Sequence, residues 1–185
     1  LLQKTGITWD SVPIQGVTIE DLRNDSFDIF REQAVRSKRI DKKDIDASNE
    51  QLLDSLNLLE NNHLKRAAIL LFHHNPEKWI PGAYIKIGYF ESDSELRYQD
   101  EIHGSLISQA DKVVDLIFTK YLKADISYQG VTRVETYPFP KEAIREAVFN
   151  AIAHKFYGAL IPIQISVYAD RIYIANDCIF PEDWT

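Results

Sequence analysis

The chain has 185 residues, of which 45% are hydrophobic and 26% charged, and its formal net charge at pH 7 is −7. This composition is typical of a globular protein with one sizeable core or two small ones. No apolar run approaches the roughly 18 residues that a membrane-spanning helix needs. The N-terminal residues lack the apolar stretch of a signal peptide, so we expect a cytoplasmic protein without a membrane partner.

The negative net charge argues against direct binding of nucleic acid by this chain, because binding to phosphates needs a concentrated basic face. A basic cluster at residues 36–43 is interrupted by Asp41, and a solvated helix end or linker is the favoured interpretation. Cys178 is the single cysteine, which excludes a disulfide framework and a thiolate metal cluster within this sequence. The chain begins at Leu1 and contains no Met, so we expect it to be an internal portion of a longer protein.

The first part of the chain predicts helices. Residues 1–45 are interpreted as a leading segment and a linker helix, which is expected to begin at a cap formed by Thr18 and to run to about Lys38. A second helix begins after the cap residue Ser48, continues with leucines through Leu59 and is broken by two asparagines. Residues 64–72 predict a third helix, which an Asn-Pro pair ends.

The middle of the chain predicts a strand, a long helix and two further strands. Residues 83–90 are rich in β-formers and predict a strand, whereas the charged residues 91–103 predict a loop or a sheet edge. Residues 104–123 have the longest helical pattern, with apolar side chains on one side. Two short strands are expected at 126–127 and 132–137.

The last part predicts a helix followed by a β-hairpin. Pro140 is placed to open the helix, which is expected to include residues 145–157. Residues 162–168 and 171–176 then alternate between apolar and polar, which predicts two strands with one face toward a core. Helices and strands in this order predict an α+β fold with a layer of helices on a mixed or antiparallel sheet.

The most informative segment is the expected helix after Pro140. Glu146, Asn150 and His154 fall four residues apart, so all three project from one side of the helix. A separate apolar stripe seats the helix on a core: Ile144, Ala147, Val148, Ala151 and Ile152. The polar stripe is either an ordinary solvated face or a line of carboxylate, carboxamide and imidazole groups that serves a site.

Helix, hairpin and the following turn together resemble the ATP-binding-type region of bacterial transcriptional regulators with a Schlafen-AlbA domain, which are also described as RecG-related. The resemblance runs from about Trp9 to Thr185. The following residues carry it: Ala67 to Phe72, Asn75-Pro76, Pro140, Arg145-Glu146-Ala147, Asn150-Ala151, His154, Tyr157, Asp170-Arg171-Ile172, Ile174 and Asn176.

The resemblance implies a fold similar to the GHKL (Bergerat) ATP-binding fold, placed here at residues 46–185, with its C-terminal end truncated. It also implies that a DNA-binding AlbA domain precedes residue 1, so that DNA is a partner through that missing domain. A second copy of the chain stays open as a further partner.

The same resemblance assigns roles on the helix. Glu146 would orient or deprotonate the attacking water as the catalytic residue, and Asn150 would ligate Mg²⁺ and help to bind ATP. His154 and Lys155 would lie toward the phosphates. The chemistry is consistent, because Mg²⁺ prefers oxygen ligands and keeps several waters, and a carboxylate close to a water is a standard general base.

The turn after the hairpin departs from the family's pattern. GHKL proteins have Asp-x-Gly-x-Gly there, whereas this chain has Asn176, followed by Cys178 and Phe180 in the places of the glycines. Asn176 could accept a hydrogen bond from adenine, but side chains at the two glycine positions would narrow the pocket. Two functions therefore stay open: a nucleotide-responsive regulatory module, and a non-catalytic interaction or dimerisation module that has lost nucleotide binding.

Overall fold

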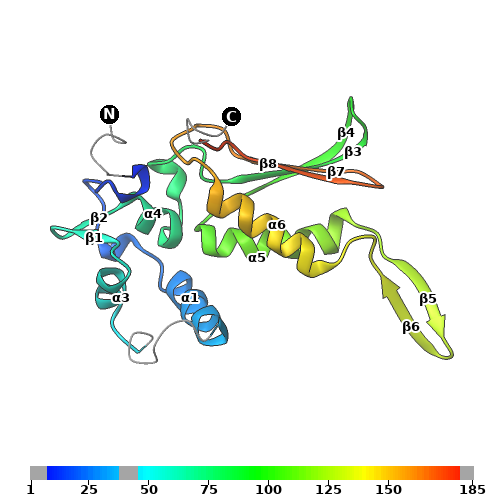
Figure 1. Ribbon diagram of the computed structural model, residues 1–185, viewed down its shortest axis with the longest axis horizontal. Coiled ribbons are helices and arrows are strands. Elements are labelled where there is room, and N and C mark those ends of the chain that lie inside the picture. Colours follow the sequence, from blue (N-terminus) through cyan, green and yellow to red (C-terminus); the bar gives the residue numbers. More distant parts are fainter. Residues whose placement is uncertain (1–7, 38–45, 180–185) are drawn as a thin grey trace. The chain divides into compact units, whose positions relative to one another are not determined.

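The computed structural model describes residues 8–37 and 46–179 (Figure 1). The chain divides into two compact units. Unit 1 comprises Leu1–Ala83 with Gly104–Ser108, and unit 2 comprises Tyr84–His103 with Gln109–Thr185. These bounds differ from the expected division after residue 45, which stays a prediction. None of the helices in the described ranges is long and apolar enough to cross a membrane.

Unit 1 is built from short helices and one small hairpin. In chain order its elements are η2 (Trp9–Ser11), η3 (Ile19–Asp21), α1 (Asn24–Ser37), α3 (Asn49–Ser55), β1 (Leu59–Glu60), β2 (His63–Leu64), α4 (Arg66–Phe72) and η4 (Pro76–Lys78). Strands β1 and β2 pair antiparallel. The core of the unit includes Phe27 and Phe72, whose rings stack with centroids 4.1 Å apart.

The predicted cap at Thr18 exists, but it opens a single 3₁₀ turn. The Asp21 carboxylate accepts a hydrogen bond from the Thr18 amide at 2.8 Å, and the α-helix starts only at Asn24. The cap at Ser48 is confirmed, since its hydroxyl oxygen accepts from the Gln51 amide. That helix ends before Leu59, which lies in β1, because Asn57 adopts a left-handed conformation with φ 56°.

Unit 2 contains a four-stranded mixed sheet in the order β4-β3-β7-β8. Its strands are β3 (Ile85–Ser92), β4 (Glu95–Ile102), β7 (Ile163–Val167) and β8 (Ile172–Ala175). Strands β3 and β7 run parallel, and the two outer pairs are antiparallel. Helices α5 (Leu106–Leu116) and α6 (Lys141–His154) cover one face of this sheet in Figure 1. The expected α+β fold, with helices on a mixed sheet, is therefore confirmed.

The core of unit 2 lies between these helices and the sheet. Every second residue of β3 and β7 points toward the helices, and the buried side chains on the sheet side include Ile85, Ile87, Ile163, Ile165 and Val167. On the helix side they include Val113, Val114, Ile144 and Val148. Helix α6 is therefore held against the sheet along one of its faces.

One segment of unit 2 agrees with the sequence-based expectation, and another differs from it. Residues 91–103, expected to be a loop or a sheet edge, contain the edge strand β4, and residues 95–99 are all exposed, which is why charged side chains are tolerated there. The helix expected over 104–123 ends at Leu116 and continues as a π-helical turn, Ile117–Tyr121, in which the Leu122 amide donates to the Ile117 carbonyl at 2.8 Å.

A further hairpin connects the two helices. Strands β5 (Asp125–Gln129) and β6 (Thr132–Thr136) pair antiparallel in a two-stranded sheet of their own. The two strands were expected, although β5 is longer than the predicted pair of residues. The predicted hairpin of β7 and β8 is also confirmed by their antiparallel register.

Candidate functional site

Helix α6 presents the predicted polar stripe. Ile144, Val148 and Ala151 are buried, which confirms the apolar stripe, whereas Ala147 is exposed and does not belong to it. Pro140 is the N-cap residue, and its carbonyl accepts from the Ile144 amide at 3.2 Å. The helix is therefore seated by its apolar face, and the opposite face is available for polar chemistry.

Glu146, Asn150 and His154 all lie on the exposed side of α6. They span about 12 Å along the axis at roughly 1.5 Å per residue. Within residues 8–37 and 46–179, none of the three side chains takes part in a hydrogen bond or an ion pair with another residue. With respect to the described residues, the carboxylate, the carboxamide and the imidazole thus keep their hydrogen-bonding capacity for water or a ligand.

The helix ends at His154, three residues earlier than expected, so Lys155 is not on the polar stripe. Lys155 has an extended backbone with ψ 135° and is buried. Its ammonium donates to the carbonyl oxygens of Ile161 at 2.7 Å and Phe156 at 3.4 Å and lies 5.0 Å from the centroid of the Tyr157 ring. Burial lowers the pKa of Lys155, while the nearby Asp177 carboxylate acts in the opposite direction.

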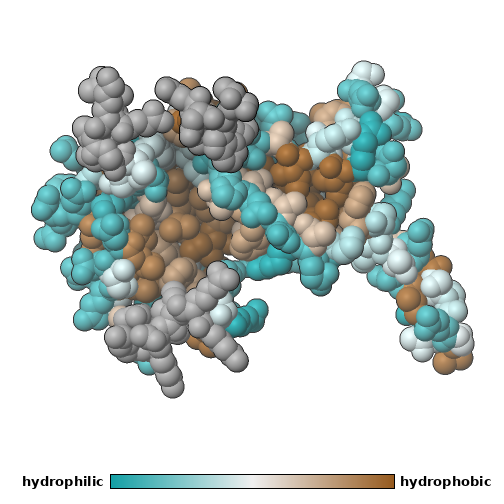
Figure 2. Space-filling view, in the orientation of Figure 1, coloured by the Kyte–Doolittle hydropathy of each residue, from teal (hydrophilic) through white to brown (hydrophobic). Residues whose placement is uncertain are grey.

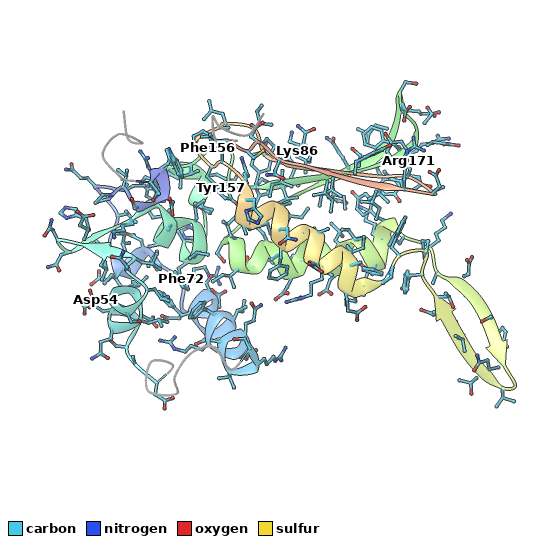
Figure 3. The ribbon with its side chains drawn as sticks, viewed as in Figure 1. Asp54, Phe72, Lys86, Phe156, Tyr157 and Arg171 are labelled. Carbon is cyan, nitrogen blue, oxygen red and sulfur yellow. The ribbon has the colours of Figure 1, made fainter. Side chains whose placement is uncertain are left out.

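The chain that leaves β8 passes beside the end of α6. The Phe156 amide donates to the Asp177 carbonyl at 2.7 Å, and Figure 3 labels Phe156 and Tyr157 beside this end of the helix. The Asn176 side-chain amide donates to the same Asp177 carbonyl at 3.3 Å. The fold thus brings Lys155 and Asn176, two of the predicted ligand-binding residues, to a common turn.

The remaining predicted residues are not joined to this turn. No hydrogen bond or ion pair within the described ranges connects Glu146 or Asn150 to Asn176. Cys178 is exposed, and Phe180 lies outside the described residues, so its effect on a pocket stays a prediction. The described residues contain no group of three or more His, Cys, Asp or Glu that could hold a metal ion; a Mg²⁺ site based on Asn150 stays a prediction as well.

Three cavities of unit 2 lie elsewhere. The first, of about 500 Å³, is lined by Glu101, Ile102, His103, Lys112, Asp115, Leu116 and Thr119. The second, of about 480 Å³, is lined by Asp115, Phe118, Thr119, Glu135, Thr136, Tyr137, Phe139, Pro140 and Lys141. The third, of about 260 Å³, is lined by Tyr89, Tyr121, Leu122, Lys123, Asp125, Pro138, Tyr168 and Ala169. None of these three is lined by a predicted site residue.

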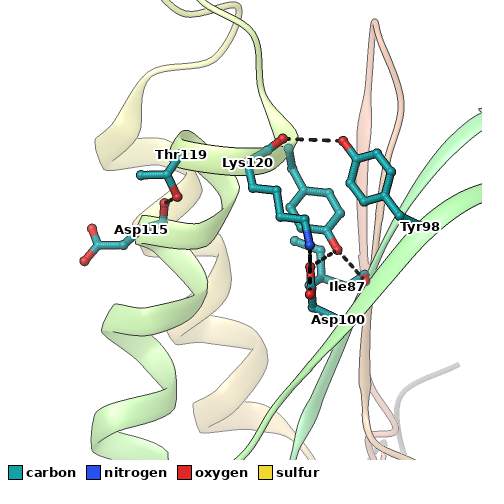
Figure 4. A network of polar contacts seen from close by, with 7 residues as sticks. Ile87, Tyr98, Asp100, Asp115, Thr119 and Lys120 are labelled. Carbon is teal, nitrogen blue, oxygen red and sulfur yellow. Dashed lines mark hydrogen bonds and ion pairs between the residues drawn. The ribbon is translucent and has the colours of Figure 1, made fainter.

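A polar cluster that the sequence did not indicate joins the π-helical turn to the sheet (Figure 4). The Tyr121 hydroxyl lies 2.7 Å from an Asp100 carboxylate oxygen and 3.0 Å from the Ile87 carbonyl oxygen. Lys120 donates to both carboxylate oxygens of Asp100, at 2.9 and 2.6 Å. These bonds, with Lys120 first, lower the pKa of Asp100, and burial raises that of Tyr121. Since the partners come from separate elements, no local spacing could have revealed them.

Comparison with known proteins finds structural similarity but no sequence match. No protein family and no curated protein match the chain by sequence. The fold is similar to the crystal structure of the DIP2311 protein from Corynebacterium diphtheriae, with a TM-score of 0.68 and 19% sequence identity. The similarity covers 98% of this chain and 36% of that protein, so this chain spans about a third of its neighbour's length. At this identity the likeness concerns the fold alone.

Proposed function

We propose that this chain is a nucleotide-responsive regulatory module of a bacterial transcriptional regulator, with a GHKL-like fold and with ATP and Mg²⁺ as its ligands. One observation carries the proposal. Helix α6 is anchored on a mixed sheet by Ile144, Val148 and Ala151, and its opposite face presents Glu146 and Asn150 without partners among the described residues. An anchored helix holds such groups in a fixed orientation at little entropic cost.

The chemistry of the exposed face suits a magnesium nucleotide. Mg²⁺ takes oxygen ligands, keeps several of its waters and commonly shares them with phosphates, so the Asn150 carboxamide oxygen would suffice as the protein ligand. Glu146, one helical turn away, would orient or deprotonate a water, and His154 would lie toward the phosphates. The adenine would meet Asn176, at the turn beyond β8.

Lys155 enters this proposal in a supporting role. Its ammonium already donates to two carbonyl groups in the turn after α6, and a phosphate would have to displace these bonds. We therefore assign Lys155 to holding the turn, against which the Asn176–Asp177 segment lies. DNA would be bound by another domain, because the net charge of −7 disfavours phosphate contacts by this chain.

A thermal unfolding experiment tests the proposal. Millimolar ATP with Mg²⁺ should raise the melting temperature of the full-length protein, and Asn150→Ala should remove most of the rise. Gln164→Ala is the matched control, because it deletes an exposed carboxamide on β7 and should leave the rise intact. If nucleotide causes no Mg²⁺-dependent rise in the unsubstituted protein, the proposal is refuted.

The second candidate is a non-catalytic interaction module with the same fold. It is favoured by Cys178 and by the residue two places later, which occupy positions where nucleotide-binding GHKL proteins have glycine. In that case Glu146→Ala should leave regulation in the cell unchanged. Nucleotide retained by the purified protein would exclude this candidate.

A further inference from the structure

The β5–β6 hairpin, residues 125–136, has no core of its own; we call it the arm. Among the described residues its two strands pair only with each other, and every residue in them is exposed except the half-buried Val134. Figure 1 shows the arm extending beyond the ends of α5 and α6. An isolated two-stranded hairpin is marginally stable in water, so this arm would gain stability from a surface on which to lie.

The arm exposes large apolar side chains on one face and at its tip. Ile126 and Tyr128 lie on the same face of β5 with 54% and 69% of their surface exposed, and Val131 at the tip is fully exposed at 100%. Figure 2 shows hydrophobic atoms along the arm. Gly130 precedes Val131 with φ +65°, which makes the tight turn possible. Clustered exposed apolar side chains of this kind indicate an interaction surface.

The same face of the arm carries one acidic residue near its root and one basic residue nearer its tip. In the hairpin register Glu135 lies opposite Ile126, near the root, and Arg133 lies opposite Tyr128, nearer the tip. The two charged side chains form an ion pair at 2.7 Å along one edge of the face. One face therefore carries an apolar column beside a column that is acidic toward the root and basic toward the tip.

Such a face is complementary to a second copy of itself. When two identical surfaces meet about a two-fold axis, each residue i that contacts j is matched by j contacting i. If two arms lie antiparallel, the basic position of each meets the acidic position of the other, and the two apolar columns are covered together. A parallel arrangement would instead place like charges side by side.

We propose that the arm is a homodimerisation element that pairs antiparallel with the arm of a second copy of this chain. The pairing covers Ile126 and Tyr128 and sets Arg133 against Glu135 of the other copy. Each five-residue strand is about 17 Å long, so the tip of one arm reaches the root of the other. There the cavity of about 480 Å³, lined in part by Phe118, Tyr137 and Phe139, can receive Val131.

The arm is separate from the proposed nucleotide site, because none of its residues belongs to that site. Its charge also favours a protein partner over a nucleic acid. Arg133 is the single cationic residue of the arm, so the arm lacks the basic surface that a phosphate backbone requires.

A charge-reversal experiment with sedimentation velocity tests the pairing. The unsubstituted chain should sediment as a dimer, and Arg133→Glu and Glu135→Arg should each sediment as monomers, because like charges then face each other. Mixed in equal amounts, the two variants should form a heterodimer, since an acidic arm then meets a basic one. Arg97→Glu is the control: this arginine is also exposed and ion-paired on a strand, but outside the arm, and its reversal should leave the dimer intact.

A second variant addresses the apolar column. Tyr128→Ser removes an exposed ring, so it should preserve the circular dichroism spectrum and raise the dimer dissociation constant at least about tenfold, which corresponds to about 1.4 kcal/mol. A chain that is monomeric at its highest soluble concentration overturns the proposal. So does a dimer that survives Arg133→Glu, or a failure of the mixed variants to associate.

Discussion

Replacing Tyr121 by Phe tests whether the polar cluster of Figure 4 stabilises unit 2. The substitution removes one hydroxyl, whose single hydrogen lies within reach of two acceptors, the Asp100 carboxylate and the Ile87 carbonyl oxygen, and leaves the ring in place. A hydrogen bond to a charged group contributes about 1.5–3 kcal/mol. Because Lys120 still pairs with Asp100, whose side chain is 32% exposed, we expect the free energy of unfolding to fall by about 1–2 kcal/mol.

Urea-induced unfolding followed by far-ultraviolet circular dichroism measures this loss as a lower transition midpoint at unchanged slope. Tyr173→Phe is the matched control, because that ring lies on β8, outside the arm, with 57% of its surface exposed, and removal of its hydroxyl should change stability by no more than about 0.5 kcal/mol. A Tyr121→Phe loss no greater than that of the control would refute the reasoning.

The pH dependence of the same variant provides a second check. The Tyr121 hydroxyl is one of the groups that hold the pKa of Asp100 below its ordinary value of 3.8. A depressed carboxyl pKa stabilises the fold above the pKa of the unfolded chain, and this contribution disappears as pH falls through the folded-state pKa. The stability difference between the two proteins should therefore narrow below about pH 4.

Three further predictions concern unit 1 and the arm. Burial and the neighbouring His74 lower the pKa of His73 from its ordinary value of 6.5. The unfolded chain therefore binds the proton more readily than the folded chain, so the free energy of unfolding should fall as pH drops below about 6.5. His73→Gln should reduce this pH dependence, which urea titrations at pH 7 and 5.5 would measure. Phe72→Ala removes a fully buried ring that stacks on Phe27, and should cost about 3–5 kcal/mol in chemical unfolding; an effect under 1 kcal/mol would contradict the described core. Gly130→Val places a β-branched residue at φ +65°, where its side chain would not meet any neighbouring atom but its backbone would be strained. The strained arm should weaken the dimer, whereas the melting temperature of the monomer should stay within a few degrees of that of the unsubstituted monomer.

The seating of α6 could be predicted from the sequence, because a helix imposes its own period. Ile144, Val148 and Ala151 recur at helical spacing, so one buried face follows from local geometry alone. For the same reason Glu146 and Asn150 were expected on a common polar face, and both are exposed there. The ligand of these residues could not be predicted in the same way, because residue spacing indicates which side chains are exposed and does not indicate which molecule they bind.

The position of Lys155 depended on tertiary structure. Its sequence neighbours favoured a longer helix, but the turn after His154 instead buries the ammonium against carbonyl groups contributed by Phe156 and Ile161. Burying an ammonium group costs free energy unless it is hydrogen-bonded, so Lys155 is buried only where the turn supplies its carbonyl acceptors. The residue spacing along one helix does not reveal such acceptors.

The charged segment 91–103 also depends on contacts with residues that are distant in the sequence. The segment 91–103 was expected to form a loop or an edge, and it forms edge strand β4 because β3 supplies the hydrogen-bonding partner. Asp100 acquires its role only when Tyr121 and Lys120 arrive from the π-helical turn, some 20 residues later.

Periodicity and capping signals are local, so they predict most of the helices and strands and the buried face of α6 without reference to the fold. The strand order β4-β3-β7-β8, the turn that joins Lys155 to the segment after β8, and the exposure of the arm depend on the three-dimensional structure. These features result from contacts between residues far apart in the chain, whose free energies are set by packing and hydrogen bonding in three dimensions.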